Sequence, residues 1–171
     1  MNKKALHKIS YGLYLVCSKK DDKINGQIAN AIFQVTSENP TIAVSINKKN
    51  LTHEYIEQSK AFTVSILKKD TPLDFVRNFG FKCGRDTDKM KDISYKIGST
   101  GAPIITDNSL AYIEAKLINK MRINTHTIFV GEVVNADIQS EDDPLTYDFY
   151  RKVKGGYTSK NAPTYIEKKR R

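Results

Sequence analysis

Residues 24–37 read INGQIANAIFQVTS, and this stretch is the basis of our interpretation of the chain. It opens with Asn25 and Gly26, a pair that favours a turn with positive φ. The rest combines small residues (Ala29, Ala31), amides (Gln27, Asn30, Gln34) and the final hydroxyls of Thr36 and Ser37. Small side chains let a flat ligand approach the backbone closely, while amides and hydroxyls offer hydrogen-bonding partners for a ligand, a phosphate included. A partly buried strand lined with polar residues would have the same sequence, so both interpretations stay open for this stretch alone.

Runs of β-branched and aromatic residues predict six strands. They cover residues 9–17, 24–37, 41–47, 61–67, 110–120 and 125–138. A doubly wound parallel sheet would need a helix after most strands, and these connections are too short for one. The pattern therefore predicts a mainly β protein, a small closed β-barrel with short peripheral helices.

Three short helices are expected, over residues 50–59, 71–80 and 144–153. In the second of them, Thr71 suits the N-cap and Pro72 suits the first helical position. Asp74 is placed to reach back as in a capping box, and Gly80 is expected to end the helix.

Composition and length place the chain among folded, soluble proteins. With 171 residues, 39% of them hydrophobic and 27% charged, the chain is expected to form one domain over residues 1–154, followed by a basic tail over residues 155–171. No apolar run is long enough to cross a bilayer and no signal-peptide core follows the first residues, so we expect a cytoplasmic protein without membrane contact. Cys17 and Cys83 are too few for a disulfide framework, and no His and Cys cluster has metal-ligand spacing, so no metal is expected.

The basic charge of the chain is concentrated at its C-terminus. The net charge is +9, and residues 151–171 hold eight Lys or Arg and one acidic residue. A nucleic-acid-binding domain would spread its basic residues over a groove or a face, so nucleic acid is not an expected partner. The tail is either a solvated terminus or an attractive surface for an acidic protein.

Seven groups of residues, in order and at the right spacing, resemble one known family. They are ISYGLY (9–14), NGQIAN with FQVTS (25–37), SINKKN with THEYI (45–56), FGFKCGRDTDK (79–89), AYIEAK (111–116), THTIFVGEVV (125–134), and VKGG with APTY (153–165). The chain resembles the flavin-reductase-like domains with the FMN-binding, Greek-key-like split-barrel fold. Within that family these motifs look closest to the flavoprotein domain of high-molecular-weight rubredoxins and to flavoredoxins.

The resemblance implies a homodimer that binds FMN non-covalently near the subunit interface. Such proteins take hydride from NADH or NADPH and pass electrons to free flavin, to oxygen or to a small redox protein. The chain has no cysteine-rich second domain, so a rubredoxin-like or other acidic redox partner would be a separate protein.

The resemblance also implies roles for individual residues. The segment that faces the edge of the flavin ring comprises Asn25, Gln27, Ile28, Ala29, Asn30 and Ala31. Thr36 and Ser37 match hydroxyls near ribityl or phosphate oxygens, and Asn47, Lys48, Asn50 and Thr52 match a loop and helix start near the cofactor. Lys89 matches the basic residue that usually pairs with the phosphate. His126 matches a histidine near the nicotinamide and flavin, which we assign to positioning them, although Thr125 stands where the family commonly has an acidic residue.

The residues alone leave other interpretations open. Lys89 could equally be a solvated lysine in a charged loop, Asn30 a satisfied strand amide, and His126 a structural histidine. Two alternative functions accompany the reductase hypothesis: a flavoredoxin-like electron carrier without its own NAD(P)H activity, and a non-enzymatic barrel that binds anionic polymers.

Overall fold

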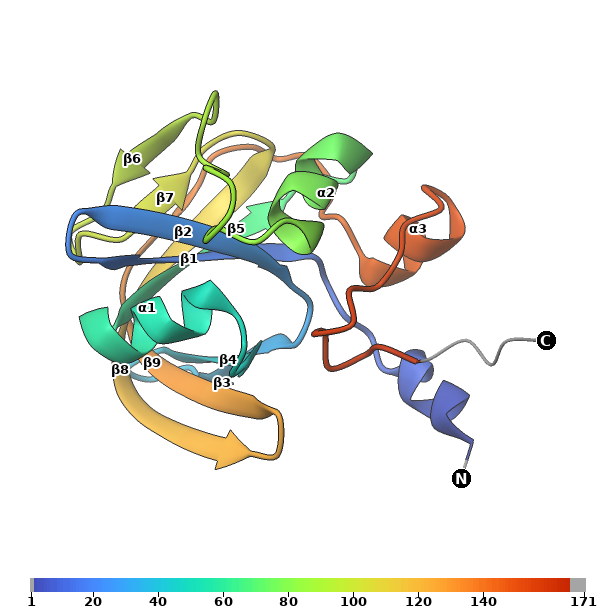
Figure 1. Ribbon diagram of the computed structural model, residues 1–171, viewed down its shortest axis with the longest axis horizontal. Coiled ribbons are helices and arrows are strands. Elements are labelled where there is room, and N and C mark those ends of the chain that lie inside the picture. The colour runs from blue at the N-terminus through green and yellow to red at the C-terminus, as the bar shows by residue number, and fades with distance from the viewer. Residues whose placement is uncertain (1, 167–171) are drawn as a thin grey trace.

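A computed structural model describes residues 2–166 and is built on one curved antiparallel sheet of seven strands (Figure 1). The strands are β1 (Tyr14–Lys20), β2 (Lys23–Ala29), β3 (Ile32–Thr36), β4 (Thr41–Asn47), β5 (Ala61–Leu67), β8 (Ser109–Ile123) and β9 (His126–Ile138). A separate two-stranded sheet holds β6 (Tyr95–Ile97) and β7 (Pro103–Ile105). The helices are η1 (Lys3–Lys8), α1 (Leu51–Ser59), α2 (Leu73–Phe81) and α3 (Tyr147–Lys152).

The sheet curls around an apolar interior because its strands alternate inward and outward side chains. On β4, Ile42, Val44 and Ile46 point inward, where they pack with core residues that include Phe62 and Phe129. A second apolar cluster joins β1 to α2 and α3, and α2 contributes Phe75, Val76 and Phe79 to it. The expected mainly β barrel with short peripheral helices is therefore confirmed.

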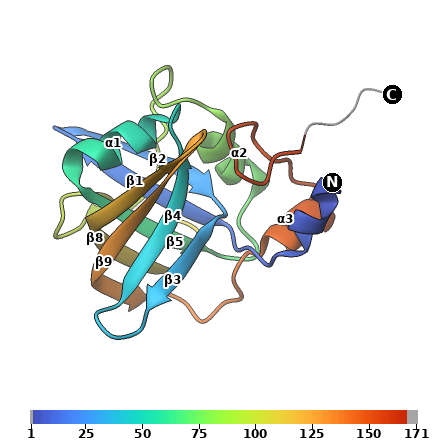
Figure 2. The same cartoon turned by 90° about the horizontal axis from the view of Figure 1, so that it is seen from below.

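The barrel is split between β2 and β3, which follow each other in the chain but form no ladder with each other. The strand order is β2-β1-β5-β8-β9-β4-β3. In the described part of the chain, β2 pairs only with β1, and β3 pairs only with β4. The single strand expected over residues 24–37 is thus wrong: Asn30 and Ala31 interrupt it and carry the chain from one edge of the sheet to the other (Figure 2). At this corner the Ser45 N–H donates to the Ala31 carbonyl oxygen at 3.0 Å, which holds the start of β3 beside β4.

Several element ends differ from those expected. Strand β1 starts at Tyr14 rather than at residue 9, because the Leu13 N–H already bonds the Leu145 carbonyl oxygen outside the sheet. Helix α2 has Pro72 as its N-cap, and the Thr71 hydroxyl donates instead to the Lys68 carbonyl oxygen at 2.6 Å. Asp74 pairs with Arg77 at 2.9 Å and forms no capping box, and the helix continues past Gly80 to Phe81.

Candidate functional site

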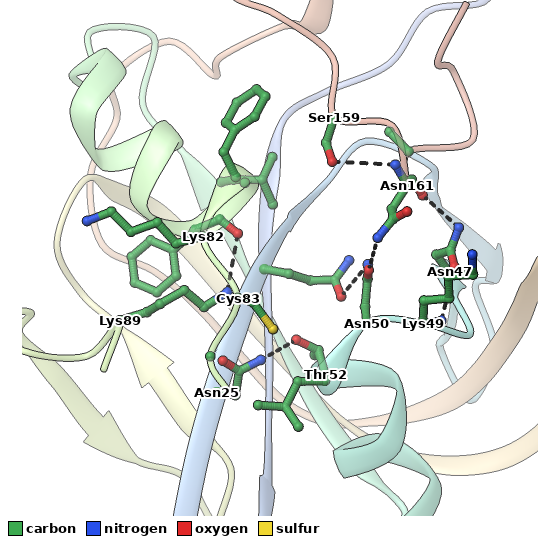
Figure 3. Close-up of a pocket in the computed structure, with 18 of the residues that line it drawn as sticks. Asn25, Asn47, Lys49, Asn50, Thr52, Lys82, Cys83, Lys89, Ser159 and Asn161 are labelled. Atoms are coloured by element: carbon green, nitrogen blue, oxygen red, sulfur yellow. Dashed lines mark hydrogen bonds between the residues drawn. The ribbon is translucent and has the colours of Figure 1, made fainter. Parts of the chain in front are cut away.

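A cavity of about 170 Å³ lies where the end of β4, strand β2 and the turns around α1 and α2 meet (Figure 3). Strand β2 contributes Asn25, Gln27 and Ile28, and β4 contributes Ser45 and Asn47. The remaining lining residues are Lys49, Asn50, Leu51, Thr52, Phe79, Gly80, Phe81, Lys82, Cys83, Gly84, Lys89, Ser159, Asn161, Ala162 and Pro163. The cavity therefore lies between the edge strand β2 and the end of β4.

Side-chain amides cross this cavity in a chain of hydrogen bonds (Figure 3). The Asn50 Nδ2 donates to Gln27 Oε1 at 3.1 Å, and the Asn161 Nδ2 donates to Asn50 Oδ1 at 2.8 Å. Beside them the Asn25 Nδ2 donates to Thr52 Oγ1 at 2.7 Å. Amides offer both donors and acceptors, so this wall can bind a ligand that carries carbonyl, N–H and hydroxyl groups.

The buried cation Lys89 dominates the electrostatics of the cavity. The residue is 5% exposed, and its Nζ donates to the Phe79 carbonyl oxygen at 3.4 Å. Burial lowers the pKa of Lys89 to about 8, although the neighbouring thiols of Cys17 and Cys83 act in the opposite direction. The cavity lining also includes Lys49 and Lys82 and contains no Asp or Glu. A buried ammonium without a carboxylate partner favours an anionic ligand.

A second, smaller cavity of about 40 Å³ adjoins the first. The two share five lining residues: Ile28, Gly80, Phe81, Ser159 and Ala162. Aromatic rings of Phe81, Tyr147, Tyr150 and Tyr157 line the smaller one, together with Asn30. Asn30 is 4% exposed, and its Oδ1 is buried without a hydrogen-bond partner. An unsatisfied buried acceptor is costly, so a ligand donor or a water is needed there.

These observations fit a phosphorylated planar heteroaromatic group such as a flavin nucleotide. Lys89 supplies a cation for the phosphate, the amides supply partners for polar ring atoms, and Asn30 supplies a free acceptor. The volume of this cavity lies below the range of about 300–1,000 Å³ that ligand sites generally have. A flavin therefore requires either a displacement of the lining or an additional wall from a second copy of the chain.

The structure brings most, but not all, of the sequence-predicted site residues together. Seven of them line the main cavity: Asn25, Gln27, Ile28, Asn47, Asn50, Thr52 and Lys89. Asn30 lies in the adjoining cavity. Ala29, Ala31, Thr36, Ser37, Lys48 and His126 do not line either cavity.

Each of the residues outside the cavities has a structural explanation. The turn at Ala31 sends β3 away from the cavity, so Thr36 and Ser37 follow the far end of that strand, where the Thr36 and Thr41 hydroxyls bond at 2.8 Å. Ala29 packs into the barrel core. The Lys48 Nζ donates to the Asn124 carbonyl oxygen at 2.7 Å.

His126 does not line the cavity, but its ring contacts Asn161, which does. The ring Nε2 and the Asn161 carbonyl oxygen are 3.1 Å apart, and the ring Nδ1 lies 2.8 Å from the Thr125 hydroxyl. We assign the proton to Nε2, because the carbonyl oxygen can only accept, and Nδ1 then accepts from Thr125. Burial lowers the pKa of His126, against the opposing effect of the Asn161 carbonyl. The imidazole is therefore neutral at physiological pH.

Two segments of the cavity wall were not assigned to the site from the sequence. They are residues 80–84, which follow α2, and residues 159–163, which lie close to the C-terminus. Residues 80–84 belong to the motif FGFKCGRDTDK, and residues 159–163 overlap the start of the motif APTY. The composition of the two segments is that of a polar loop and of a tail. The only signal for them was the resemblance of these motifs.

A split barrel whose cavity combines a buried lysine, amides and no acidic residue fits a flavin-binding class of proteins. Residues 6–156 match the model of the flavin reductase like domain, so the chain belongs to the flavin reductase like family. The expected class, a flavin-reductase-like oxidoreductase, is thereby confirmed.

Three relatives illustrate this membership. The chain is 48% identical to a high molecular weight rubredoxin of Moorella thermoacetica, over 96% of this chain and 72% of the relative. It is 43% identical to a ferric-chelate reductase (NAD(P)H) of Archaeoglobus fulgidus, over 99% of this chain and 100% of the relative. The solved structure of the flavin reductase PheA2 superposes with a TM-score of 0.71 at 31% identity, covering 83% of this chain and 88% of that chain.

Residues 2–166 lack two features that would indicate other kinds of function. No helix in this part of the chain is long and apolar enough to cross a membrane. Nor does it contain a group of three or more His, Cys, Asp or Glu side chains that could hold a metal ion.

Proposed function

We propose that this chain binds FMN non-covalently in the cavity, takes hydride from NADH or NADPH, and passes the electrons to free flavin, oxygen or a small redox protein. The observation that carries the proposal is Lys89, a buried cation in a cavity without Asp or Glu, within a flavin reductase fold. When bound, the flavin supplies the hydride-accepting and electron-passing chemistry.

The residues of the chain divide the work of binding. Lys89 holds the phosphate, because an ammonium and a phosphate form a strong charge-assisted hydrogen bond. The amides of Gln27 and Asn50 orient polar ring or ribityl atoms from the wall between β2 and α1. Asn30 accepts a hydrogen bond from the ligand or from a water at its edge.

His126 acts as a positioning residue in this proposal. Its Nε2 donates a hydrogen bond to the Asn161 carbonyl oxygen, and the Asn161 side chain in turn bonds Asn50 in the cavity wall. The Thr125 hydroxyl takes over the task of a preceding acidic residue, because it fixes the ring tautomer through Nδ1.

We further propose a homodimer whose interface is the outer face of β3, β4, β9 and β8. Strand alternation places five apolar residues on this face: Phe33, Ala43, Val130, Ile128 and Met121. In the strand register, Phe33 pairs with Ala43, Ala43 with Val130, and Ile128 with Met121. Phe33 is 61% exposed and Met121 is 60% exposed. Ala43 is buried between them, and Ile128 and Val130 are partly exposed. Exposed apolar side chains gathered on one face of a sheet are typical of an interface between subunits.

This face continues directly into the cavity. On β4, Ala43, Ser45 and Asn47 point to the same side of the strand, and the last two line the cavity. A second copy seated on the face therefore comes close to the cavity mouth and can supply the wall that a flavin ring still needs. FMN would then lie near the interface.

We also propose that the protein acceptor of the electrons is an acidic redox protein. Lys49 and Lys82 line the cavity and are exposed, and the Arg85 guanidinium donates to the Lys49 carbonyl oxygen at 3.4 Å. These basic residues lie where an acidic partner would approach a bound flavin. The relative from Moorella thermoacetica, named as a rubredoxin, extends beyond the region that matches this chain. The basic residues Lys168–Arg171 of the tail lie outside the described residues.

An absorption spectrum tests the proposal. Protein reconstituted with FMN and freed of excess ligand should show the flavin bands, and anaerobic NADH or NADPH should bleach them. Protein that retains no FMN contradicts the binding proposal. Bleaching by a reduced protein partner but by neither nicotinamide nucleotide would identify an electron carrier instead of a reductase.

A further inference from the structure

Residues 157–166, which we call the C-terminal strap, lie beyond the family match, which ends at residue 156. After α3 the chain turns back toward the barrel and passes along the region between β4 and α2, shown in red (Figures 1 and 2). The strap supplies Ser159, Asn161, Ala162 and Pro163 to the cavity wall. A segment outside the common domain thus forms one side of the ligand site.

The two ends of the strap are anchored away from the main cavity. At one end the Tyr150 hydroxyl donates to the Tyr157 carbonyl oxygen at 2.9 Å. At the other end Thr164 is 8% exposed; its hydroxyl accepts from the Asn30 Nδ2 at 2.8 Å and donates to the Tyr147 hydroxyl at 3.1 Å. These contacts fix where the strap leaves and rejoins the body of the protein.

Between the anchors, the strap is held over the cavity mainly by polar contacts of one residue. The Asn161 Nδ2 donates to Asn50 Oδ1 at 2.8 Å, and its carbonyl oxygen accepts from the Asn47 Nδ2 at 3.3 Å and from His126 at 3.1 Å. Asn161 is only half-buried, whereas the anchor Thr164 is buried. Hydrogen bonds at a half-buried site exchange easily with water, so the middle of the strap can lift while its ends stay attached.

We propose that the C-terminal strap is a cover that lifts at residues 159–163 to admit FMN and then closes over it, so that FMN is kept as a resident group instead of being exchanged at each turnover. The inference rests on the proposed function. Asn161 is the latch: it bonds Asn50 when the cover is closed. The cavity of about 170 Å³ is smaller than ligand sites generally are, and lifting the strap, which forms one of its walls, would enlarge it.

The rate at which FMN leaves the protein tests this cover. We would measure it by the recovery of flavin fluorescence after FMN-loaded protein is diluted to a concentration far below its Kd for FMN. Asn161→Ala removes the bond to Asn50 and should raise the dissociation rate constant about fivefold, the effect of one hydrogen bond. A chain ending at residue 156, which retains the whole family match, should lose FMN more than tenfold faster.

Matched controls separate the cover from general damage. Lys160→Gln alters the exposed neighbour of Asn161, and a chain ending at residue 166 lacks only Glu167 and the final four basic residues. Both should release FMN at the unmodified rate. If the chain ending at 156 does not fold, as judged by circular dichroism, the comparison of Asn161→Ala with Lys160→Gln decides the matter.

Proteolysis gives a readout that is independent of the dissociation rate. Lys160 is exposed in the strap and is a trypsin site, so bound FMN should slow cleavage there by holding the strap closed. Equal FMN dissociation rates in Asn161→Ala and in the unmodified chain, with cleavage at Lys160 unaffected by FMN, would overturn the cover while the proposed function stands. An unmodified chain that binds no FMN would instead overturn the proposed function.

Discussion

The Lys89 ammonium lies over the Phe79 side chain, with its Nζ 3.4 Å from the Phe79 carbonyl oxygen and 5.9 Å from the centre of the Phe79 ring. A single long hydrogen bond and a distant aromatic ring satisfy only part of an ammonium that has three donors. Within residues 2–166 no carboxylate forms an ion pair with it. The Lys89 ammonium can therefore still donate hydrogen bonds to a ligand.

Lys89→Ala should weaken FMN binding more than His126→Ala does. Loss of a charge-assisted hydrogen bond to the phosphate costs about 1.5–3 kcal/mol, equivalent to a rise in Kd of roughly 10- to 150-fold. His126 acts on the cavity only through Asn161, so its removal should change Kd by less than about fivefold. Titration of the apoprotein with FMN, followed by flavin fluorescence, measures both. Equal or reversed effects would show that Lys89 does not hold the phosphate.

FMN affinity should fall as the pH rises through about 8. Burial lowers the pKa of Lys89 to about 8, so the cation that attracts the phosphate is present below this pH and is lost above it. Fluorescence titrations between pH 6.5 and 9.5 should therefore show Kd increasing on the alkaline side. In Lys89→Met this increase should be absent, and its persistence there would assign the effect to another group.

Lys89→Met should stabilise the flavin-free protein while it weakens FMN binding. The pKa of Lys89 is about 8 in the folded protein and 10.5 in the reference state, so folding disfavours the charged form. This destabilisation is fully present below pH 8 and disappears as the pH rises toward 10.5. At pH 7 the substitution should raise the free energy of unfolding by an amount on the order of 2–3 kcal/mol.

Urea unfolding of the apoprotein at pH 7 and pH 10 measures this effect. The difference between Lys89→Met and the unmodified chain should shrink at the higher pH. A variant that is less stable than the parent at pH 7 would show that the lysine is well satisfied without a ligand.

Phe33→Asp should convert the proposed dimer into monomers. Phe33 is 61% exposed and stands on the outer face beside Ala43, so a second copy would bury it and a carboxylate there would be buried without a partner. Ile97→Asp is the matched control, because Ile97 is 57% exposed but belongs to the small sheet of β6 and β7. Sedimentation velocity distinguishes the two variants. A parent chain that sediments as a monomer, or a dimer unaffected by Phe33→Asp, would contradict the proposed interface.

The sequence was sufficient to predict the barrel because strand alternation is a local property. β4, with its inward Ile42, Val44 and Ile46, was predicted with the bounds that the structure has, as was β5. Lys89 and Asn25 were placed at the site by the resemblance, and both line the cavity. The three-residue strands β6 and β7 are too short for their alternation to stand out from a loop.

The sequence could not predict features that depend on contacts distant in the chain. The break at Asn30 is stabilised by Thr164, which lies more than a hundred residues away, so residues 24–37 looked like one strand. The same holds for Asn161, whose partners Asn47 and Asn50 belong to the first third of the chain. Thr36 and Ser37 were assigned to the site by the resemblance, and the bend at Asn30 and Ala31 carries them away from the cavity.

The split between the first and last strands of the sheet gives the ligand a mechanical task as well as a chemical one. Gln27 on the edge strand β2 and Ser45 on β4, the neighbour of the other edge strand, both line the cavity, and Asn30 and Ala31 carry the chain from β2 to β3. A nucleotide that contacts both strands would hold the two sides of the split together. Its binding energy would then add to the resistance of the whole fold to heat and proteases. The supply of vitamin-derived nucleotide in a cell would then determine how many copies of the protein survive, in addition to how many of them work.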